Sequence, residues 1–233
     1  MKKIGIIIFT VAIIVGITFA NFFSWGKTSA RIFNFNVSFG GVKGSGNVRS
    51  EKRGIAEFKA IEVGGVFEVE VVAQKDFNVE IAADDNLLQY IKTEVKGDTL
   101  EISTTKSISP NNPIRVRISA PDIESLEVSG VSKVLLTNLQ NDLLKIDASG
   151  ASKIKVEGET RNLEIELSGA SRLDAENLKA EDVNVDASGA SRADVNVSGD
   201  LKTDLSGASK VIYSGNPKNF EKSTSGASSV NAK

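Results

Sequence analysis

A tetrapeptide of small residues recurs through the second half of the chain at an almost constant interval. It reads Ser-Gly-Val-Ser at 129–132 and Ser-Gly-Ala-Ser in the copies that start at positions 149, 168, 188, 206 and 225. Successive copies start 18 to 20 residues apart. A unit this short cannot bury an apolar face alone, whereas stacked units share one continuous interior. The spacing therefore predicts an all-β fold, a single-stranded parallel β-helix (β-solenoid) with rungs of about 19 residues.

Apolar residues stand at the same places in successive units. Five places before the first Ser of each copy from 149 onward are Leu144, Leu163, Val183, Leu201 and Phe220. On both sides of the tetrapeptide apolar and polar residues alternate, which is the period of a strand. An antiparallel sandwich also gives short strands between turns, but it does not place one kind of residue at one position five times. We therefore expect the solenoid, with Gly at backbone angles closed to other residues and the small Ala and Ser where the coil is thinnest.

The first half of the chain lacks the tetrapeptide. Five glycines among polar residues between 26 and 50 predict a linker that runs into a first strand. From Glu57 onward a period of two predicts further strands. Asp84 or Asp85 is expected to cap a helical turn over residues 86–91, whose apolar side chains share one helical face. The expected divisions are a segment 1–25, a linker and first strand 26–50, and a β-helix domain 51–233.

The N-terminus differs in composition from the rest. Lys2 and Lys3 precede 17 residues without charge, 4–20, and Trp25 follows shortly after. The segment is either a cleaved signal peptide or a membrane anchor, because residues 4–25 approach the roughly 20 residues that span a bilayer. Both alternatives predict an exported body, and the anchor predicts contact with the membrane through residues 4–25.

The residue inventory excludes several kinds of chemistry. With 28 basic against 30 acidic residues, the net charge of −2 gives no basic surplus for nucleic acid. The chain has neither Cys nor His, which excludes disulfides, thiolate or imidazole metal sites and His-based triads. The repeated Ser has no histidine base to activate it. We therefore expect no catalytic residue, no cofactor and no metal site.

Two rows of charged residues flank the tetrapeptide. Two places before the first Ser is an acidic row, Glu127, Asp147, Glu166, Asp186 and Asp204. Four places after it is a basic row, Lys133, Lys153, Arg172, Arg192 and Lys210. Strand alternation predicts that the side chains of both rows point outward. The like charges within each row repel one another, and we expect the opposite charges of the neighbouring row to offset this repulsion. They are interpreted as solvated ladders that keep the surface soluble, or alternatively as a binding stripe for a glycan or a protein surface.

A carbohydrate-active enzyme, either a lyase or a glycoside hydrolase, is the rival hypothesis. Solenoid folds can present carboxylates across a groove, and the separation of two carboxyl groups then sets the outcome of hydrolysis. Here the acids form a regular row, and the one local acidic pair, Asp84-Asp85, is assigned to helix capping. A single deep groove with two or more unpaired carboxylates would favour the enzyme. A uniform laddered surface would favour a structural or adhesive module, which is the function we expect.

Four motifs, in this order, carry a resemblance to a known family. They are "GSGNV" at 44–48, "FKAIEVGGVFEVEV" at 58–71, "DDNLLQYIKTEVKGDTLEIS" at 84–103 and the Ser-Gly-Ala-Ser repeats. The chain resembles the bacterial family of putative auto-transporter adhesin head domains, also called head GIN domains, over roughly residues 44–233. The resemblance implies a right-handed parallel β-helix and export to the cell envelope. It implies no catalytic residues.

Overall fold

The computed structural model describes residues 40–233, which form one compact unit. The predicted signal peptide or anchor over 1–25, and the first part of the predicted linker, lie outside the described residues. Within 40–233 no helix is long and apolar enough to cross a membrane.

The described residues fold almost entirely into strands, with one short 3₁₀ helix, η1 (Leu88–Tyr90). In chain order the strands are β1 (Val42–Lys43), β2 (Val48–Arg53), β3 (Ala60–Gly65), β4 (Glu68–Val72), β5 (Asn78–Asp84), β6 (Ile91–Lys96), β7 (Thr99–Thr104), β8 (Ile108–Ser109), β9 (Arg115–Ser119), β10 (Ser125–Gly130), β11 (Lys133–Ala148), β12 (Lys153–Leu167), β13 (Arg172–Ala187), β14 (Arg192–Val197), β15 (Asp200–Leu205), β16 (Lys210–Gly215), β17 (Asn219–Thr224) and β18 (Ser229–Ala232).

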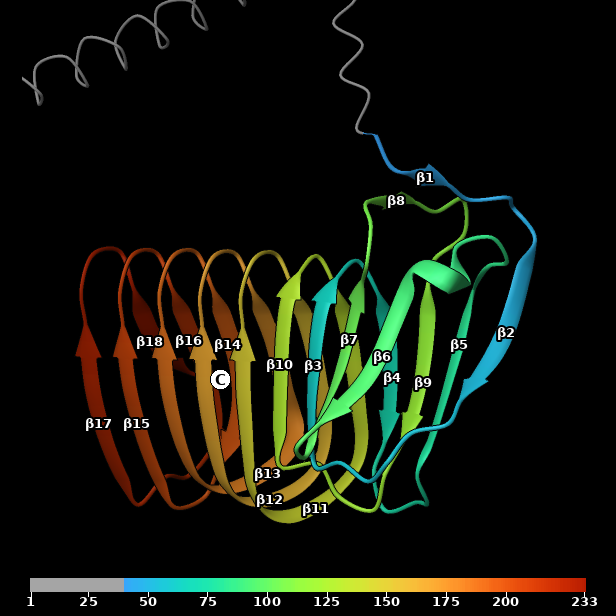
Figure 1. The fold of residues 1–233 in the computed structure, drawn as a ribbon. Coiled ribbons are helices and arrows are strands. Elements are labelled where there is room, and N and C mark those ends of the chain that lie inside the picture. The colour runs from blue at the N-terminus through green and yellow to red at the C-terminus, as the bar shows by residue number, and fades with distance from the viewer. Residues whose placement is uncertain (1–39) are drawn as a thin grey trace, which may run out of the picture. The chain divides into compact units, whose positions relative to one another are not determined.

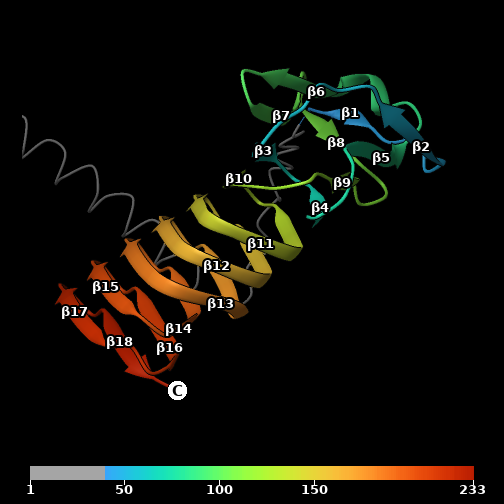
Figure 2. The ribbon, with the colours of Figure 1, turned by 90° about the horizontal axis from the view of Figure 1, so that it is seen from below.

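From β10 onward the chain winds as a solenoid of parallel strands, as the repeat predicts (Figure 1). One face consists of β3, β10, the C-terminal parts of β11 to β13, β15 and β17, and we call it the β10 face. The other, the β4 face, consists of β4, the N-terminal parts of β11 to β13, β14, β16 and β18. The long strands β11 to β13 pass from the β4 face to the β10 face and run side by side in Figure 2.

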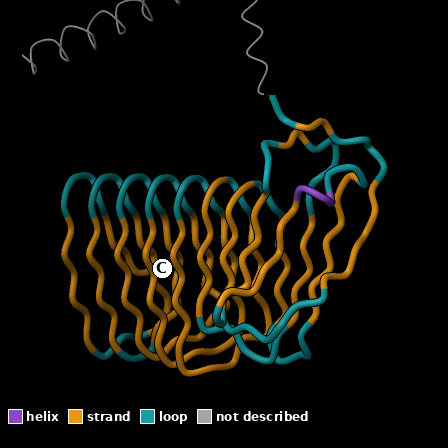
Figure 3. Tube along the Cα trace, in the orientation of Figure 1, coloured by secondary structure: helices purple, strands orange, loops and turns teal. Residues whose placement is uncertain are grey.

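The Ser-Gly-Ala-Ser turns reverse the chain between the two faces and form the regular row of loops in Figure 3. Gly169 has φ +71°, and a Cβ there would lie 2.5 Å from the carbonyl oxygen of Gly150 in the turn before it. The N–H of Ala170 donates to that same carbonyl at 2.8 Å. The fourth residue, Ser171, is buried and its Oγ donates to the carbonyl of Ser168 at 2.9 Å. Stacking of the turns therefore demands Gly in second place and a small hydroxyl residue in fourth.

The interior is a stack of aliphatic residues contributed by equivalent places of successive rungs. Leu126, Ile146, Ile165 and Val185 are partners in register and each is at most 2% exposed. Thr203 follows them in the same buried column. Alternation along each strand therefore places the intervening charged residues on the outer surface.

The N-terminal end differs from the expectation of a uniform parallel helix over residues 51–233. Strands β7 and β9 continue the parallel stacks beside β3 and β4, but β6, β5 and β2 are then added antiparallel. The hairpin of β6 and β7 turns on two residues, of which Gly97 has φ +63°. Glycine at the first position of a two-residue loop favours this tight reversal. Irregular antiparallel strands thus close this end of the solenoid.

The helical turn predicted over residues 86–91 is reduced to η1, and its capping by Asp84 is wrong. The cap residue is Leu87, and no side chain caps it. The carboxylate of Asp84 is fully buried and accepts hydrogen bonds from Gly46 N at 3.1 Å, Asn111 N at 2.7 Å and Asn112 Nδ2 at 2.7 Å. These bonds, the one from the Asn112 side chain foremost, hold the pKa of Asp84 below its usual value.

Asp85 does not cap a helix either. Its carboxylate accepts hydrogen bonds from Ser45 Oγ and from Asn86 N. The "GSGN" stretch at 44–47 is thus bound to the end of β5, and β2 pairs with residues 79–84 of β5. Residues 40–50 therefore belong to the compact unit 40–233, and the strand β2 begins within them at Val48.

Candidate functional site

The acidic row lies on the β10 face. Its members are exposed, and they are partners on successive strands: Glu127 with Asp147, Asp147 with Glu166, Glu166 with Asp186 and Asp186 with Asp204. Within residues 40–233 none of these five carboxylates forms an ion pair or a side-chain hydrogen bond.

The register continues this row toward the N-terminal end, which the sequence analysis missed. Glu62 of β3 is the partner of Glu127, Glu101 of β7 is the partner of Glu62, and Glu94 of β6 is the partner of Glu101. We call the full set, from Glu94 to Asp204, the extended acidic row. Partial burial raises the pKa of Glu127, and the negative charges of Glu62 and Asp147 on either side raise it further.

Lysines neutralise only the N-terminal end of the extended acidic row. Lys96 contacts Glu101 at 2.6 Å, and Lys92 contacts Glu94 at 2.5 Å. The following member, Glu62, forms no ion pair in the described part of the chain. Six contiguous carboxylates, from Glu62 to Asp204, are therefore left without a cationic partner among residues 40–233.

The basic row lies on the β4 face, where its members are also partners in register. Lys133 contacts Glu68 at 3.4 Å, and Arg172 lies 3.8 Å from Asp194. Lys153 and Lys210 have no acidic partner within residues 40–233. No ion pair among the described residues joins the basic row to the acidic row, because the turns place them on opposite faces. The predicted local offset of one row by the other is therefore not seen.

Arg192 is the one member of the basic row that is held tightly. Its Nε and Nη2 both donate to the carboxylate of Asp194, at 2.8 and 2.7 Å. Asp194 is only 3% exposed, and its hydrogen bonds raise the pKa of Arg192. Arg192 thus serves to pair a buried carboxylate, and it is less available to a ligand than Lys153 or Lys210.

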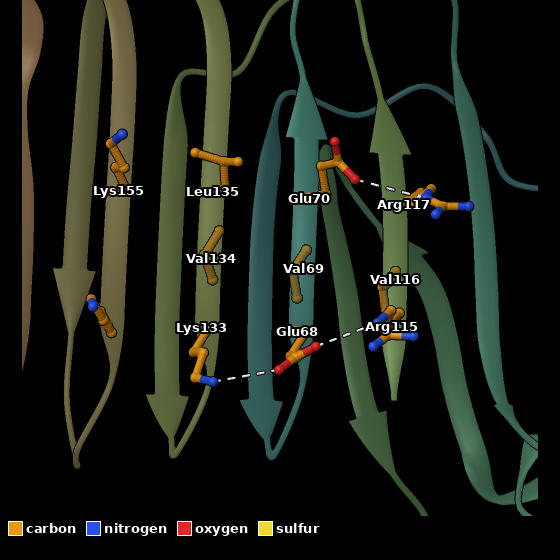
Figure 4. Close-up of a pocket in the computed structure, with 11 residues that line it drawn as sticks. Glu68, Val69, Glu70, Arg115, Val116, Arg117, Lys133, Val134, Leu135 and Lys155 are labelled. Atoms are coloured by element: carbon orange, nitrogen blue, oxygen red, sulfur yellow. Dashed lines mark hydrogen bonds and ion pairs between the residues drawn. The ribbon is translucent and has the colours of Figure 1, made fainter. Parts of the chain in front are cut away.

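A groove of about 360 Å³ crosses the β4 face where β9, β4, β11 and β12 lie side by side. Figure 4 shows Glu68 between Lys133 and Arg115, with Glu70 directed at Arg117. The distances are 3.5 Å from Arg115 Nε to Glu68 and 3.7 Å from Arg117 Nε to Glu70. Both carboxylates of the groove are therefore paired.

The remaining lining of the groove gives it an excess of positive charge. Lys153 and Lys155 line it on the side of β12, and the half-buried Leu135 lies between Glu70 and Lys155 in register. With Arg115, Arg117 and Lys133 the groove holds five cations against its two carboxylates. Such a surface suits a ligand that carries negative charges and a small apolar area.

The described residues contain no group of three or more Asp, Glu, His or Cys side chains that could hold a metal ion. The equal spacing of the carboxylates along the extended acidic row separates them instead of converging them on one point.

Comparison with known families settles the classification. Residues 57–217 match the family model described as "Putative auto-transporter adhesin, head GIN domain". The chain belongs to this family. The resemblance carried by the four sequence motifs is thereby confirmed, and the described body is a head GIN domain. A comparison with curated proteins finds no match.

Solved structures share the fold of this head GIN domain. A putative adhesin from Bacteroides fragilis is 22% identical, with a TM-score of 0.70 over 83% of this chain and 100% of its own. A putative adhesin from Parabacteroides merdae is 18% identical, with a TM-score of 0.55 over 82% and 98%. A putative lipid binding protein from Parabacteroides distasonis is 17% identical, with a TM-score of 0.56 over 82% and 99%. At these identities the likeness establishes the fold.

Proposed function

We propose that this head GIN domain is a non-enzymatic binding module, structural or adhesive, that is exposed at the bacterial cell envelope. The observation that carries the proposal is the basic row, which runs in register through successive rungs of the β4 face and continues into the groove beside Lys133. Repeated, equivalent charges favour a ligand that touches several rungs at once, because weak contacts gain strength through multivalency.

The ligand in this proposal is a negatively charged glycan or protein surface. Lys153 and Lys210 present exposed side chains on the β4 face, and the groove adds the arginines of β9 and Lys155, whose ammonium group also contacts Glu157 at 2.7 Å. Residues 4–25 would serve as the signal peptide or membrane anchor that exports this right-handed solenoid. Family membership and the adhesins among the solved structures support an extracellular or envelope location.

Pairing within the groove supports binding over catalysis. A glycosidase or lyase needs a carboxylate whose surroundings differ from those of its neighbours, so that its pKa fits the reaction. Glu68 and Glu70 are both held by arginines, and the acids on the β10 face recur in nearly equivalent surroundings. Two acidic residues of the described body, Asp84 and Asp194, have surroundings of their own, but both are buried and their carboxylates are held by hydrogen bonds.

The body 40–233 can be tested alone, because it is a compact unit whose buried core and paired strands lie within it. An array of acidic and neutral glycans, probed with this body, is expected to retain it on acidic glycans. Deleting one whole unit, residues 188–205, removes Arg192 together with its partner Asp194 and should weaken retention while preserving the fold. Release of reducing sugar or unsaturated product, abolished by changing Glu68 or Glu70 alone, would refute the proposal.

A further inference from the structure

We propose that one partner of this module is a second copy of the same chain, with the acidic row of one copy docked on the basic row of the next. This inference rests on the proposed function, because it specifies what the binding surface binds. It follows from three observations: both rows are regular, they carry opposite charge, and they lie on opposite faces of one solenoid.

The two rows match in spacing without any adjustment. Both belong to strands stacked in parallel register in the same solenoid, so successive charges are separated by roughly 4.8 Å on each face. From Lys133 to Lys210 the basic row covers four such steps, or about 19 Å. The six unpaired carboxylates from Glu62 to Asp204 cover five steps, or about 24 Å. A basic row can therefore lie along an acidic row with a carboxylate opposite each cation.

The acidic row needs counter-charges that its own body does not supply. Like charges at neighbouring positions on paired strands destabilise a sheet, and Glu127 lies between Glu62 and Asp147 in just this way. Ion pairs with lysines relieve the repulsion at Glu94 and Glu101, and the charge of Lys96 also acts on Glu62. The basic row of another copy would relieve it along the rest of the row. Partial burial, and after it the negative charges of Glu62 and Asp147, raise the pKa of Glu127.

The placement of the rows fixes the kind of assembly. Because the contacting surfaces differ, the interface is heterologous, and a docked pair of copies keeps one free acidic row and one free basic row. Repetition of the contact adds copies side by side into an open array instead of closing a two-fold dimer. Glu68 takes the place of a cation next to Lys133 on the β4 face, and its carboxylate is paired with Arg115 and Lys133. The contiguous run of cations therefore ends at Lys133.

Association should be weak in solution and sensitive to salt. Exposed ion pairs individually contribute little, and dissolved ions screen them. Copies held on one surface would associate more strongly, since their local concentration is high. The test therefore uses the body 40–233 at low ionic strength, where electrostatic attraction is strongest.

Two complementary variants test the interface, with circular dichroism to verify that each one folds. The acidic-row variant carries Asp147→Lys, Glu166→Lys and Asp186→Lys. The basic-row variant carries Lys133→Glu, Lys153→Glu and Lys210→Glu, and it leaves Arg192 with its buried partner. The control variant carries Lys75→Glu and Lys218→Glu, two exposed lysines in loops outside both rows.

Sedimentation velocity should show a mass that increases with concentration for the wild-type body and for the control variant, and that returns to the monomer at high salt. Each row variant alone should remain monomeric. An equimolar mixture of the two row variants should associate again, because the first keeps an intact basic row and the second an intact acidic row. A merely destabilised or generally repulsive variant would not be rescued by mixing.

The proposal is overturned if the wild-type body stays monomeric at low salt up to ~1 mM, or if the mixture of folded row variants stays monomeric. It is also overturned if the control variant fails to associate like the wild type. Self-association and the proposed function fail separately. Retention on acidic glycans by a monomeric body would refute only the second copy as partner, whereas turnover dependent on Glu68 or Glu70 would refute the binding module.

Discussion

Replacing Gly169 with alanine probes the contact on which the stacking of the turns depends. Gly169 occupies the second place of its tetrapeptide, with φ +71°. A methyl group there would lie 2.5 Å from the carbonyl oxygen of Gly150 and 3.1 Å from its nitrogen. Both atoms belong to the backbone of the preceding turn, so no side chain can rotate away to relieve the contact. The rungs would have to separate, or the turn would have to change conformation.

The expected loss of stability has two parts. A residue with a Cβ in the left-handed region costs about 1–2 kcal/mol. Forcing an extra methyl group into a packed contact costs typically about 1–3 kcal/mol more. The free energy of unfolding should therefore decrease by roughly 2–5 kcal/mol in Gly169→Ala.

Two other glycines separate the conformational cost from the cost of the backbone contact. Gly97 also has a positive φ of +63°, but a Cβ there meets nothing within 4 Å, so Gly97→Ala should cost only the conformational part of about 1–2 kcal/mol. Gly54 has neither a positive φ nor a contact within 4 Å. Gly54→Ala should be neutral, or should stabilise by up to ~1 kcal/mol through the unfolded chain.

Urea unfolding of the body 40–233, followed by circular dichroism, gives the midpoint and the slope of the transition for each variant. The urea concentration at the midpoint should be highest for Gly54→Ala, lower for Gly97→Ala and lowest for Gly169→Ala, with the slope of the transition unchanged. Equal midpoints for Gly97→Ala and Gly169→Ala would refute this expectation. They would mean that the close approach of Gly169 to the backbone of Gly150 adds nothing to the cost of the extra methyl group.

Three further changes test the interior, the buried ion pair and the N-terminal end. Ile165→Asp, at a site 2% exposed, should lower the free energy of unfolding by roughly 3–5 kcal/mol in a urea melt, whereas Glu166→Ala on the outer surface should change it by under about 0.5 kcal/mol. Arg192→Ala should cost more than about 1.5 kcal/mol in the same melt, because the buried carboxylate of Asp194 loses its hydrogen bonds from Arg192 and keeps only Arg172, at 3.8 Å. The pKa of Asp84 is lowered in the folded state, so the ionised carboxylate stabilises the fold above the usual pKa of 3.8, and this stabilisation is lost as the pH falls through the lowered pKa. Asp84→Asn should therefore lower the melting temperature at pH 7 more than at pH 2.

The solenoid could be predicted from the sequence because its cause is local and repeated. Each rung must satisfy the same contacts with the rung before it, so the same residue types return at the same places. Gly in second place and the buried fourth Ser follow directly from the carbonyl oxygens that they approach. The same repetition located the two charged rows, since strand alternation decides which side chains face outward.

The N-terminal end could not be predicted in the same way, because its contacts join residues far apart in the sequence. Asp84 looks like a helix cap when only its neighbours along the chain are considered. Its hydrogen bonds go to Gly46 and to Asn111 and Asn112, which lie 27 to 38 residues away. The burial of Asp194 beside Arg192 could not be predicted from the sequence either. Both residues lie on the outward side of their strand, where a carboxylate is normally exposed to solvent.

One signal for the missing part of the acidic row was nevertheless present. Gly64 and Gly65 are the partners of Ser129 and Gly130, so "GGVF" at 64–67 stands where a tetrapeptide would stand in the first rung. Phe67 replaces the closing Ser, and Ser132 of the next turn supplies the hydroxyl instead, accepting from Phe67 N and donating to the Gly65 carbonyl. Alignment on this degenerate copy places Glu62 in the acidic row.

The same alignment shows that the solenoid begins at β3 and β4 and is then interrupted. Residues 73–124 intervene after β4: within them β7 and β9 extend the parallel stacks and β5 and β6 are added antiparallel, before β10 resumes the coil. The groove lies at this junction, where β9 of the interruption, β4 of the first rung and β11 of the resumed coil meet in one sheet. Repetition restricts singular arrangements of side chains in the later rungs, where the buried pair of Arg192 and Asp194 is an exception. The junction is free of that restriction, and this explains why Glu68, Glu70 and the arginines of β9 occur there, at one end of an otherwise uniform basic row.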